Sequence, residues 1–308
     1  MNDGGRTWRR INEEESIKIR SYLLDEGGIE KGMNPEQEKW KILVLDSTFT
    51  LYYTSTLHST PSSKHIDSIA KIRKKIDKIK GPNWPQTNKD YLIGFDESGK
   101  GEMIGDTIVA GVLFSKNIEK DLDIIASTSN TKRKHKFEYW DKVYSKLLSV
   151  KKDRLGYKIE KISPDEADKS DLDDLLDNRY QIILNSFSKE VDISRCRVVI
   201  DNYGIRVNLK LFLDSLEEKG AEIIIEEKAD ERYLEVKIAS IMAKRYRENI
   251  LNTINNNEEY KIEGLSPGSG NANDEDTHEW LEKWSQTEKE WPSFVKRSYK
   301  TVKRIDKR

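Results

Sequence analysis

Two adjacent carboxylates follow an apolar segment that has the character of a strand. Residues 91–95 read Tyr-Leu-Ile-Gly-Phe, and Asp96 and Glu97 come where that segment ends. Because side chains alternate in direction along a strand, Asp96 and Glu97 cannot both face the core. A turn readily accommodates an Asp, but a Glu beside it, followed by the small residues Ser98 and Gly99, is less usual there. The pair is therefore the first candidate for chemistry.

Two further acids stand at similar places. Asp201 follows Val198-Val199-Ile200, and Asp230 comes shortly after Ile223-Ile224-Ile225, at the start of an expected helix. Taken alone, Asp201 is typical of an ordinary acid at a strand end, and Asp230 is typical of a helix N-cap. Their positions relative to Asp96 give them a second interpretation.

If three strand ends meet at one edge of a sheet, Asp96, Glu97, Asp201 and Asp230 form one acidic cluster. Four carboxylates repel one another strongly unless cations lie among them. Hard oxygen ligands select Mg²⁺ or Mn²⁺, and two such ions about 4 Å apart can hold the attacking and leaving oxygens of a phosphodiester. The cluster therefore predicts two-metal phosphoryl chemistry.

A nucleotide-binding P-loop is the main competing interpretation of this region. Residues 94–100 match its G-x-x-x-x-G-K pattern. The loop requires Ser or Thr at the next position to bind magnesium, and Gly101 is found there. The acids Asp96 and Glu97 would also repel the phosphate oxygens that such a loop cradles. We therefore set the P-loop aside.

The composition is that of a globular protein. The 308 residues suffice for one large and one small domain, and hydrophobic and charged residues each make up 35% of them. The formal net charge is −1, so a nucleic-acid surface must come from local clustering. Cys196 is the single cysteine, which excludes an internal disulfide and a multi-cysteine zinc site, and we expect a buried thiol. Without a signal-like or membrane-spanning apolar run, a cytoplasmic protein with no membrane partner is expected.

The hydrophobic pattern predicts two parts. Residues 1–85 are expected to form a small α+β substrate-binding domain that ends in the breaker at 81–85, and residues 86–308 an α/β domain. The expected elements of the first part are helices at 13–24 and 66–80 and strands at 40–45 and 49–54. Those of the second part are strands at 91–96, 107–114, 197–200 and 222–225 and helices at 136–150, 172–188 and 231–251. The helix at 66–80 and the tail from Lys296 are both basic, and each either faces solvent or follows phosphates.

Four blocks in chain order resemble the type 2 ribonucleases H. Residues 96–101, Asp-Glu-Ser-Gly-Lys-Gly, resemble the signature D-E-[SA]-G-[KR]-G. Residues 228–230, followed by 239–244 and Arg247, resemble the K-A-D … A-A-S-I-I-A-K … R helix. Residues 267–270 resemble a G-S-G loop, and residues 294–301 resemble the F-V-R-x-S-x-K-T element. Four blocks in the right order make this a specific match.

This resemblance implies a ribonuclease H-like mixed sheet with flanking helices and a four-acid metal site. Carried over by position, the ligands of two Mg²⁺ or Mn²⁺ ions are Asp96, Glu97, Asp201 and Asp230. The implied reaction is in-line hydrolysis of the RNA strand of an RNA–DNA hybrid, which leaves 5′-phosphate and 3′-hydroxyl ends. No obligate protein partner is implied.

The resemblance also implies contacts to the nucleic acid. The Gly99-Lys100-Gly101 turn is similar to the segment that reads the ribose 2′-hydroxyl through backbone groups, and Ser98 precedes it in the same motif. Glycines let the backbone approach a sugar closely, and the 2′-hydroxyl is what distinguishes RNA from DNA. Lys300, in the basic C-terminal element, is a further expected contact.

Within the family, the sequence is more similar to the ribonuclease HIII branch than to the HII branch. Ser98 and Glu102 resemble the HIII form D-E-S-G-K-G-D, and residues 1–85 are compatible with the TATA-binding-protein-like domain of that branch. The HII branch has a tyrosine after G-S-G, where this chain has Asn271, so weak or absent incision at single ribonucleotides is expected. Such incision, or hybrid binding without catalysis, are the alternatives.

One part of the family pattern is missing. Members usually have a D-S-K segment about 30 residues after the first motif, whereas residues 127–134 read Ser-Thr-Ser-Asn-Thr-Lys-Arg-Lys. The phosphate-binding lysine is therefore unassigned, with Lys132 as the candidate.

Overall fold

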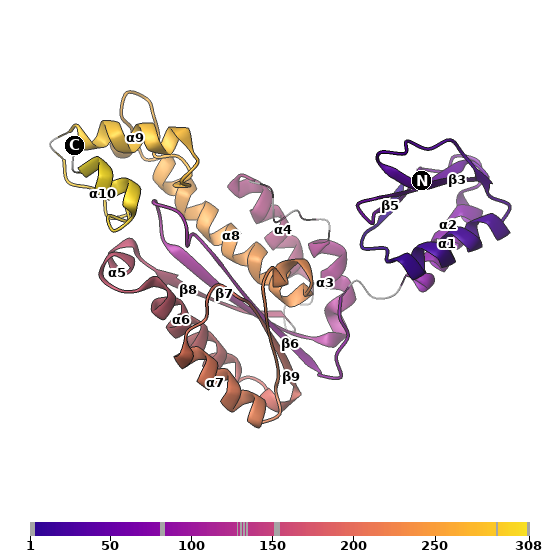
Figure 1. Cartoon of the computed structure of the whole chain (residues 1–308), viewed down its shortest axis with the longest axis horizontal. Coiled ribbons are helices and arrows are strands. Elements are labelled where there is room, and N and C mark those ends of the chain that lie inside the picture. The colour runs from indigo at the N-terminus through magenta and orange to yellow at the C-terminus, as the bar shows by residue number, and fades with distance from the viewer. Residues whose placement is uncertain are drawn as a thin grey trace. The chain divides into compact units, whose positions relative to one another are not determined.

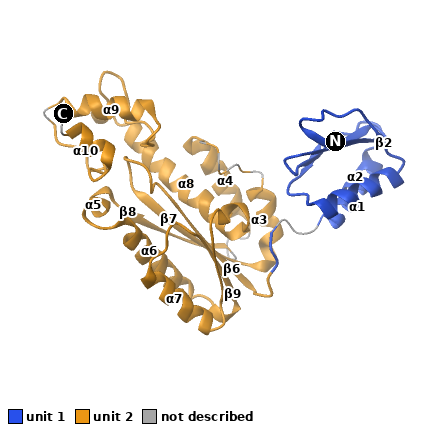
Figure 2. Ribbon diagram, in the orientation of Figure 1, with its two compact units in different colours: residues 1–86 blue, residues 87–308 orange. Residues whose placement is uncertain are grey.

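The computed structural model describes residues 4–80, 84–127, 129, 131, 133, 135–150, 155–287 and 289–306. The chain divides into two compact units, residues 1–86 and 87–308 (Figure 2). Among the described residues, none of the helices has both the length and the apolar character that crossing a membrane requires. The expected linker residues Gly81, Pro82 and Asn83 lie outside the described residues.

The first unit is an antiparallel sheet with two helices. Its strand order is β1-β5-β4-β3-β2. The elements are β1 (Arg6–Trp8), α1 (Glu13–Asp25), β2 (Ile29–Glu30), β3 (Glu38–Val44), β4 (Ser47–Tyr52), β5 (Leu57–Ser59) and α2 (Ile66–Ile79). Apolar side chains of α2, Ile69, Ile72 and Ile76, are buried in the same core as Ile42 and Phe49 of the sheet. Both helices and the two longer strands were predicted; β1, β2 and β5 are too short to leave a clear pattern in the sequence.

The second unit is built on a mixed sheet of order β10-β9-β6-β7-β8. Its strands are β6 (Tyr91–Ser98), β7 (Thr107–Ser115), β8 (Leu155–Ile162), β9 (Cys196–Asp201) and β10 (Glu222–Glu226). β6, β7 and β8 are antiparallel neighbours, whereas β6, β9 and β10 run parallel. The mixed sheet expected from the sequence is therefore present, and Cys196 is buried in it as predicted.

Helices cover both faces of this sheet (Figure 1). They are α3 (Glu119–Ala126), α4 (Phe137–Ser149), α5 (Pro164–Lys169), α6 (Leu172–Phe187), α7 (Val207–Glu218), α8 (Leu234–Asn255), α9 (Glu275–Ser285) and α10 (Lys300–Asp306). α8 packs on β6 and β7 with α3 and α4 beside it, and α6 and α7 share the core of the opposite face.

Gly94 allows α8 to lie directly on β6. A Cβ atom at Gly94 would lie 2.2 Å from the carbonyl carbon of Glu235 and 2.4 Å from its oxygen. Both contacts are to backbone, so no side-chain rotation would relieve them. Glu235 itself is fully buried and accepts a 2.8 Å hydrogen bond from Arg197 Nε on β9. The start of α8 is thus fixed to two strands of the sheet.

The C-terminal segment returns to the loop that follows β6. Val295 forms an isolated bridge with Ile104, and Lys296 N donates to Met103 O at 2.9 Å. Phe294 and Val295 belong to an apolar cluster with Trp280 and Leu281 of α9. This packing holds residues 294–299 against the 99–105 loop.

The observed elements of the larger unit differ from the prediction in two places that bear on the site and in one strand that was not predicted. β6 extends to Ser98, two residues beyond the predicted 91–96, so Glu97 also lies inside the strand. β8 was not predicted, because its glycine and charged residues disrupt the apolar pattern at this sheet edge. The long helix begins at Leu234, not at residue 231, and is preceded by a short 3₁₀ turn over Ala229–Glu231.

Candidate active site

The strand register brings Asp96 and Asp201 together. β6 and β9 run parallel with Phe95 paired to Ile200, so the next residues along each strand are Asp96 and Asp201. Adjacent strands lie about 4.8 Å apart. On the other side, Asp201 pairs with Glu226 of β10. Glu226 forms a 2.7 Å ion pair with Arg232, which leaves Asp96 and Asp201 as the central acids of this row.

Asp96 and Glu97 leave β6 on opposite faces, as their alternation requires. Asp96 interacts with Ser240 and Lys244 of α8. Glu97 turns toward α6, where the hydroxyl of Tyr180 donates a 2.9 Å hydrogen bond to its Oε2. Tyr180 is fully buried and its ring stacks on Phe95, with 5.1 Å between centroids. Glu97 is therefore held by a rigid partner.

Asp230 is placed by the turn before α8. The N-cap of that helix is Tyr233, so the interpretation of Asp230 as its cap is wrong. Asp230 lies in the 3₁₀ turn Ala229–Glu231, where its Oδ2 accepts a 3.0 Å hydrogen bond from Thr131. The same turn donates the Ala229 N–H to Asp201 Oδ1 at 3.3 Å. The turn therefore links the third and fourth acids.

The four acids form one electrostatic group. Burial raises the pKa of Asp96 above its ordinary value, and repulsion by Asp201 and Asp230 adds to this effect, while Lys244 opposes it. Burial also raises the pKa of Glu97, with Asp96 the next cause. The pKa of Asp201 is raised by burial and by Asp230. Negative charge here is poorly solvated and only partly compensated, so the site favours a bound cation.

The donor set fits hard divalent ions. It consists of carboxylate oxygens, the ligands that Mg²⁺ and Mn²⁺ prefer. As the side chains stand, no three acid, imidazole or thiol groups of the described residues converge tightly enough to hold one ion. The physical reason is that Asp96 and Glu97 leave opposite faces of β6 and that like charges separate. Asp96 and Asp201 lie at neighbouring strand ends, and Asp230 lies in the turn that donates to Asp201.

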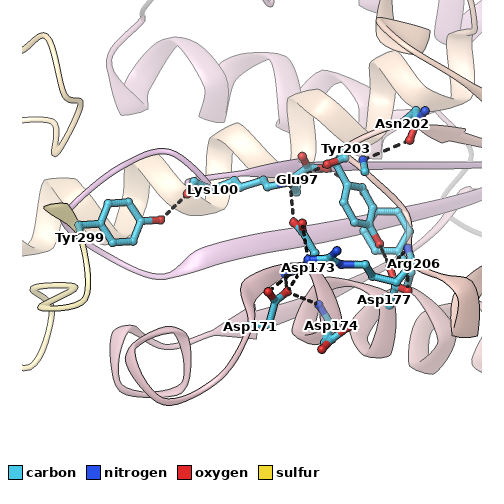
Figure 3. Close-up of polar contacts among 12 residues, drawn as sticks. Glu97, Lys100, Asp171, Asp173, Asp174, Asp177, Asn202, Tyr203, Arg206 and Tyr299 are labelled. Atoms are coloured by element: carbon cyan, nitrogen blue, oxygen red, sulfur yellow. Dashed lines mark hydrogen bonds and ion pairs between the residues drawn. The ribbon is translucent and has the colours of Figure 1, made fainter.

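The Gly99-Lys100-Gly101 turn follows β6 directly in the chain. The ammonium of Lys100 donates to Tyr203 O at 2.7 Å and pairs with Asp173 of α6 at 2.7 Å (Figure 3). The side chain of Lys100 is therefore anchored to the protein, and Gly101, the next residue of the turn, is exposed. Lys300, the other predicted contact, is exposed at the first position of α10.

A cavity of about 460 Å³ opens beside the turn. Ser98 lines it, together with Thr131 and Arg133 from the segment in which the phosphate-binding lysine was sought. Lys132 lies outside the described residues. Lys244 and Arg247 of α8 also line the cavity, and so do the acids Glu102, Glu248 and Asp274, so its wall carries charges of both signs.

Several residues of the site were missed by sequence reasoning. Tyr180 and Thr131 each donate a hydrogen bond to one of the four acids, and Lys244 interacts electrostatically with Asp96. Lys244 was quoted only as part of a motif, and Tyr180 has no signal beyond its apolar position in α6. Lys296 was grouped with a basic tail, but its side chain is fully buried. Partners of this kind depend on tertiary contacts between distant segments.

Comparison with known proteins supports the interpretation of this geometry. The family model Ribonuclease HII matches residues 93–302. The Ribonuclease HII of Pyrococcus furiosus is 31% identical over 226 residues, which cover 69% of this chain and 90% of that protein.

Two solved structures extend the likeness. The ribonuclease H2 of Pyrococcus horikoshii is 25% identical with a TM-score of 0.57, over 70% of this chain and 97% of that one. Bst-RNase HIII, solved in complex with Mn²⁺, is 13% identical with a TM-score of 0.58, over 99% of this chain and 98% of that one, which indicates a shared fold only. The HIII branch is not distinguished from HII by these matches. With a family model that spans most of the larger unit and a relative that is 31% identical over most of its length, the chain belongs to the ribonuclease HII family, the type 2 ribonucleases H.

Proposed function

We propose that this protein hydrolyses the RNA strand of RNA–DNA hybrids at the strand end formed by Asp96 and Asp201. Membership of the family makes it a metal-dependent endoribonuclease. The observation that carries the site is the parallel register that sets Asp96 beside Asp201. Glu97 and Asp230 complete the proposed set, because both interact electrostatically with Asp96.

Two Mg²⁺ or Mn²⁺ ions are the proposed cofactors, held by Asp96, Glu97, Asp201 and Asp230. Such ions would supply charge neutralisation and alignment for attack on a phosphodiester. The Mn²⁺ complex of Bst-RNase HIII is in keeping with this choice, although that likeness concerns the fold alone.

The chain's own side chains hold the acids in place. Tyr180 orients Glu97 by donating to Oε2, which opposes the rise of the Glu97 pKa caused by burial, and Thr131 donates to Asp230. Lys244 balances part of the charge of Asp96. The turn at residues 99–101 presents backbone groups to the ribose. Water attacks the phosphodiester in line, and the products are expected to carry 5′-phosphate and 3′-hydroxyl ends.

A cleavage assay on an RNA–DNA hybrid with Mg²⁺ or Mn²⁺ tests the proposal. We expect cleavage by the wild type and loss of it in the double variant Asp96→Asn and Asp201→Asn. Asp90→Asn is the matched control, because Asp90 is an exposed acid just before β6 that pairs only with exposed Arg195 at 2.8 Å among the contacts described. Activity that persists in the double variant would refute the assignment of the acids.

The same assay separates the two alternatives. A DNA duplex with a single embedded ribonucleotide tests incision of the HII kind, and Asn271 at the cavity wall leads us to expect little of it. A protein that binds the hybrid tightly but leaves it intact with either metal would be a non-catalytic binder.

We propose that the smaller unit binds the substrate. We also propose that the protein belongs to the HIII branch and that it acts in the cytoplasm. Its α2 carries four exposed lysines, Lys71, Lys74, Lys75 and Lys78, at spacings that place them on one face of the helix. None of these four lysines forms an ion pair with the described residues, so their charge is available to a polyanion.

A further inference from the structure

The ammonium of Lys296 is buried beneath the Gly99-Lys100-Gly101 turn. Lys296 is 0% exposed, and its Nζ donates to Gly99 O at 2.6 Å and to Thr107 Oγ1 at 2.9 Å. The Thr107 hydroxyl donates to the same carbonyl at 3.0 Å. Burial lowers the pKa of Lys296 to about 8, against the opposing effect of Glu102. A buried cation is costly, so its place under one carbonyl needs an explanation.

The next carbonyl of the turn is held by the same segment. The hydroxyl of Tyr299 donates to Lys100 O (Figure 3). The segment that carries both donors is itself anchored, because Lys296 N donates to Met103 O and Gly105 N donates to Phe294 O at 2.8 Å. Consecutive carbonyls at Gly99 and Lys100 are thus fixed from one side by two side chains.

Peptide geometry converts these contacts into a direction for the N–H groups. In a trans peptide the C=O of one residue and the N–H of the next point in opposite directions. Holding Gly99 O and Lys100 O toward the C-terminal segment therefore turns the N–H groups of Lys100 and Gly101 away from it. Neither N–H has an acceptor among the described residues. Gly101 is exposed, and a Cβ atom there would meet nothing within 4 Å, so the space beside this residue is open.

The turn can adopt this conformation only with glycine at position 99. Gly99 has a φ of +99°, and a Cβ atom there would lie 2.7 Å from Asp106 O. Both the positive φ and the close approach to backbone exclude a side chain. The conformation of the turn is therefore specified locally by Gly99 and from a distance by the C-terminal segment.

We propose that Lys296 and Tyr299 are positioning residues which aim the N–H groups of Lys100 and Gly101 at the substrate's 2′-hydroxyl, and thereby set the preference of the enzyme for RNA over DNA. The inference rests on the proposed function of this site. Neither side chain needs to touch the substrate. A 2′-hydroxyl oxygen accepts hydrogen bonds from such donors, whereas a deoxyribose leaves them unpaired. Loss of the alignment therefore weakens binding of the RNA–DNA hybrid but not binding of a DNA duplex.

The test compares Tyr299→Phe and Lys296→Met with wild type in two binding measurements. The affinities for an RNA–DNA hybrid and for a DNA duplex of the same sequence are measured by fluorescence anisotropy with Ca²⁺ in place of the catalytic metal. We expect each variant to bind the hybrid about tenfold more weakly, the size of one good hydrogen bond to an aligned donor. Affinity for the DNA duplex should stay unchanged, so the ratio of the two affinities falls.

Tyr144→Phe is the matched control, because its hydroxyl contacts Tyr157 and not the turn. A role in folding alone would lower both affinities equally or leave both unchanged, and either result overturns the inference. If Lys296→Met does not fold, Tyr299→Phe decides alone, since it deletes only one oxygen atom. Wild-type protein that fails to cleave the hybrid would instead overturn the proposed function, which keeps the two failures distinct.

Discussion

Asp96 and Asp201 lie side by side on parallel strands, one residue beyond the pair formed by Phe95 and Ile200. The strands that carry them are largely apolar and buried, so water solvates these carboxylates poorly. The folded protein must hold like charges at one strand end, and this requirement has measurable consequences for stability as well as for catalysis.

The first consequence is a pH-dependent stability of the metal-free protein. Burial raises the pKa of Asp96 to about 6 and that of Glu97 to about 8, so between about pH 4 and pH 8 the folded state binds more protons than the unfolded state. Their contribution to stability is therefore most favourable below pH 4 and declines as the pH rises toward 8. In urea titrations with a chelator, the free energy of unfolding of Asp96→Asn should decline less steeply with rising pH than that of the wild type over this window.

Two controls accompany that measurement. Asp90→Asn should retain the wild-type slope, because Asp90 pairs with Arg195 at the surface and belongs to another part of the unit. Added Mg²⁺ should stabilise the wild type more than Asp96→Asn, since a ligand that binds only the folded state raises its stability. Parallel slopes for wild type and Asp96→Asn would contradict the electrostatic account of the cluster.

The second prediction concerns Tyr180. Replacing Tyr180 by Phe removes the hydroxyl that donates to Glu97 and keeps the ring that stacks on Phe95. Loss of a hydrogen bond to a ligand carboxylate typically costs about 10- to 100-fold in metal affinity or activity. A Mn²⁺ titration of hybrid cleavage should show this loss in Tyr180→Phe, whereas the peripheral variant Tyr144→Phe should match wild type. An unchanged Mn²⁺ requirement would exclude this role.

The third prediction concerns the contact of α8 with β6. Gly94→Ala places a methyl group 2.2 Å from the backbone of Glu235, so α8 must move. Overpacking of this kind costs about 1–3 kcal/mol or more, and the shift should also displace Lys244 from Asp96 and reduce activity. Gly156→Ala on β8 is the control, because its nearest contact would be an ordinary 3.6 Å. Equal unfolding midpoints for the two variants would show that the sheet adapts without cost.

The sequence allowed the acids to be named but not their partners. Asp96 and Glu97 stood out because a Glu rarely follows an Asp at an apolar strand end, and β9 and β10 were visible as apolar runs. The register between β6 and β9, which makes Asp96 and Asp201 neighbours, depends on pairing between segments about 100 residues apart. Local patterns carry no information about such pairing.

Lys296 shows the same limit from the other direction. In the sequence it begins a run of basic residues and resembles a solvated tail, yet in the structure it is fully buried against Gly99 and Thr107. Only the return of the C-terminal segment to the loop after β6, through contacts such as that of Val295 with Ile104, places it there. Burial of a charged residue is decided by tertiary packing and not by its neighbours in sequence.

The last prediction addresses how the smaller unit binds nucleic acid. The exposed lysines of α2 are changed together to glutamine in one variant: Lys71, Lys74, Lys75 and Lys78. Because each phosphate contact releases counterions, the slope of log affinity against log salt should fall by up to about 0.7–0.9 for each lysine that contacts a phosphate. The measurement is hybrid affinity from 50 to roughly 200 mM salt, with kcat as a check that the acids of the larger unit still function.

A second variant with the same change in charge makes that test specific. It replaces by glutamine four cations of the same unit that already form ion pairs: Lys18, Arg20, Lys39 and Lys41. Their charge is partly neutralised by neighbouring carboxylates, so a polyanion gains less from them. If the α2 lysines follow the phosphate backbone, only the first variant flattens the salt dependence while kcat is retained. Equal effects of the two variants would mean that net charge, and not the face of α2, attracts the hybrid.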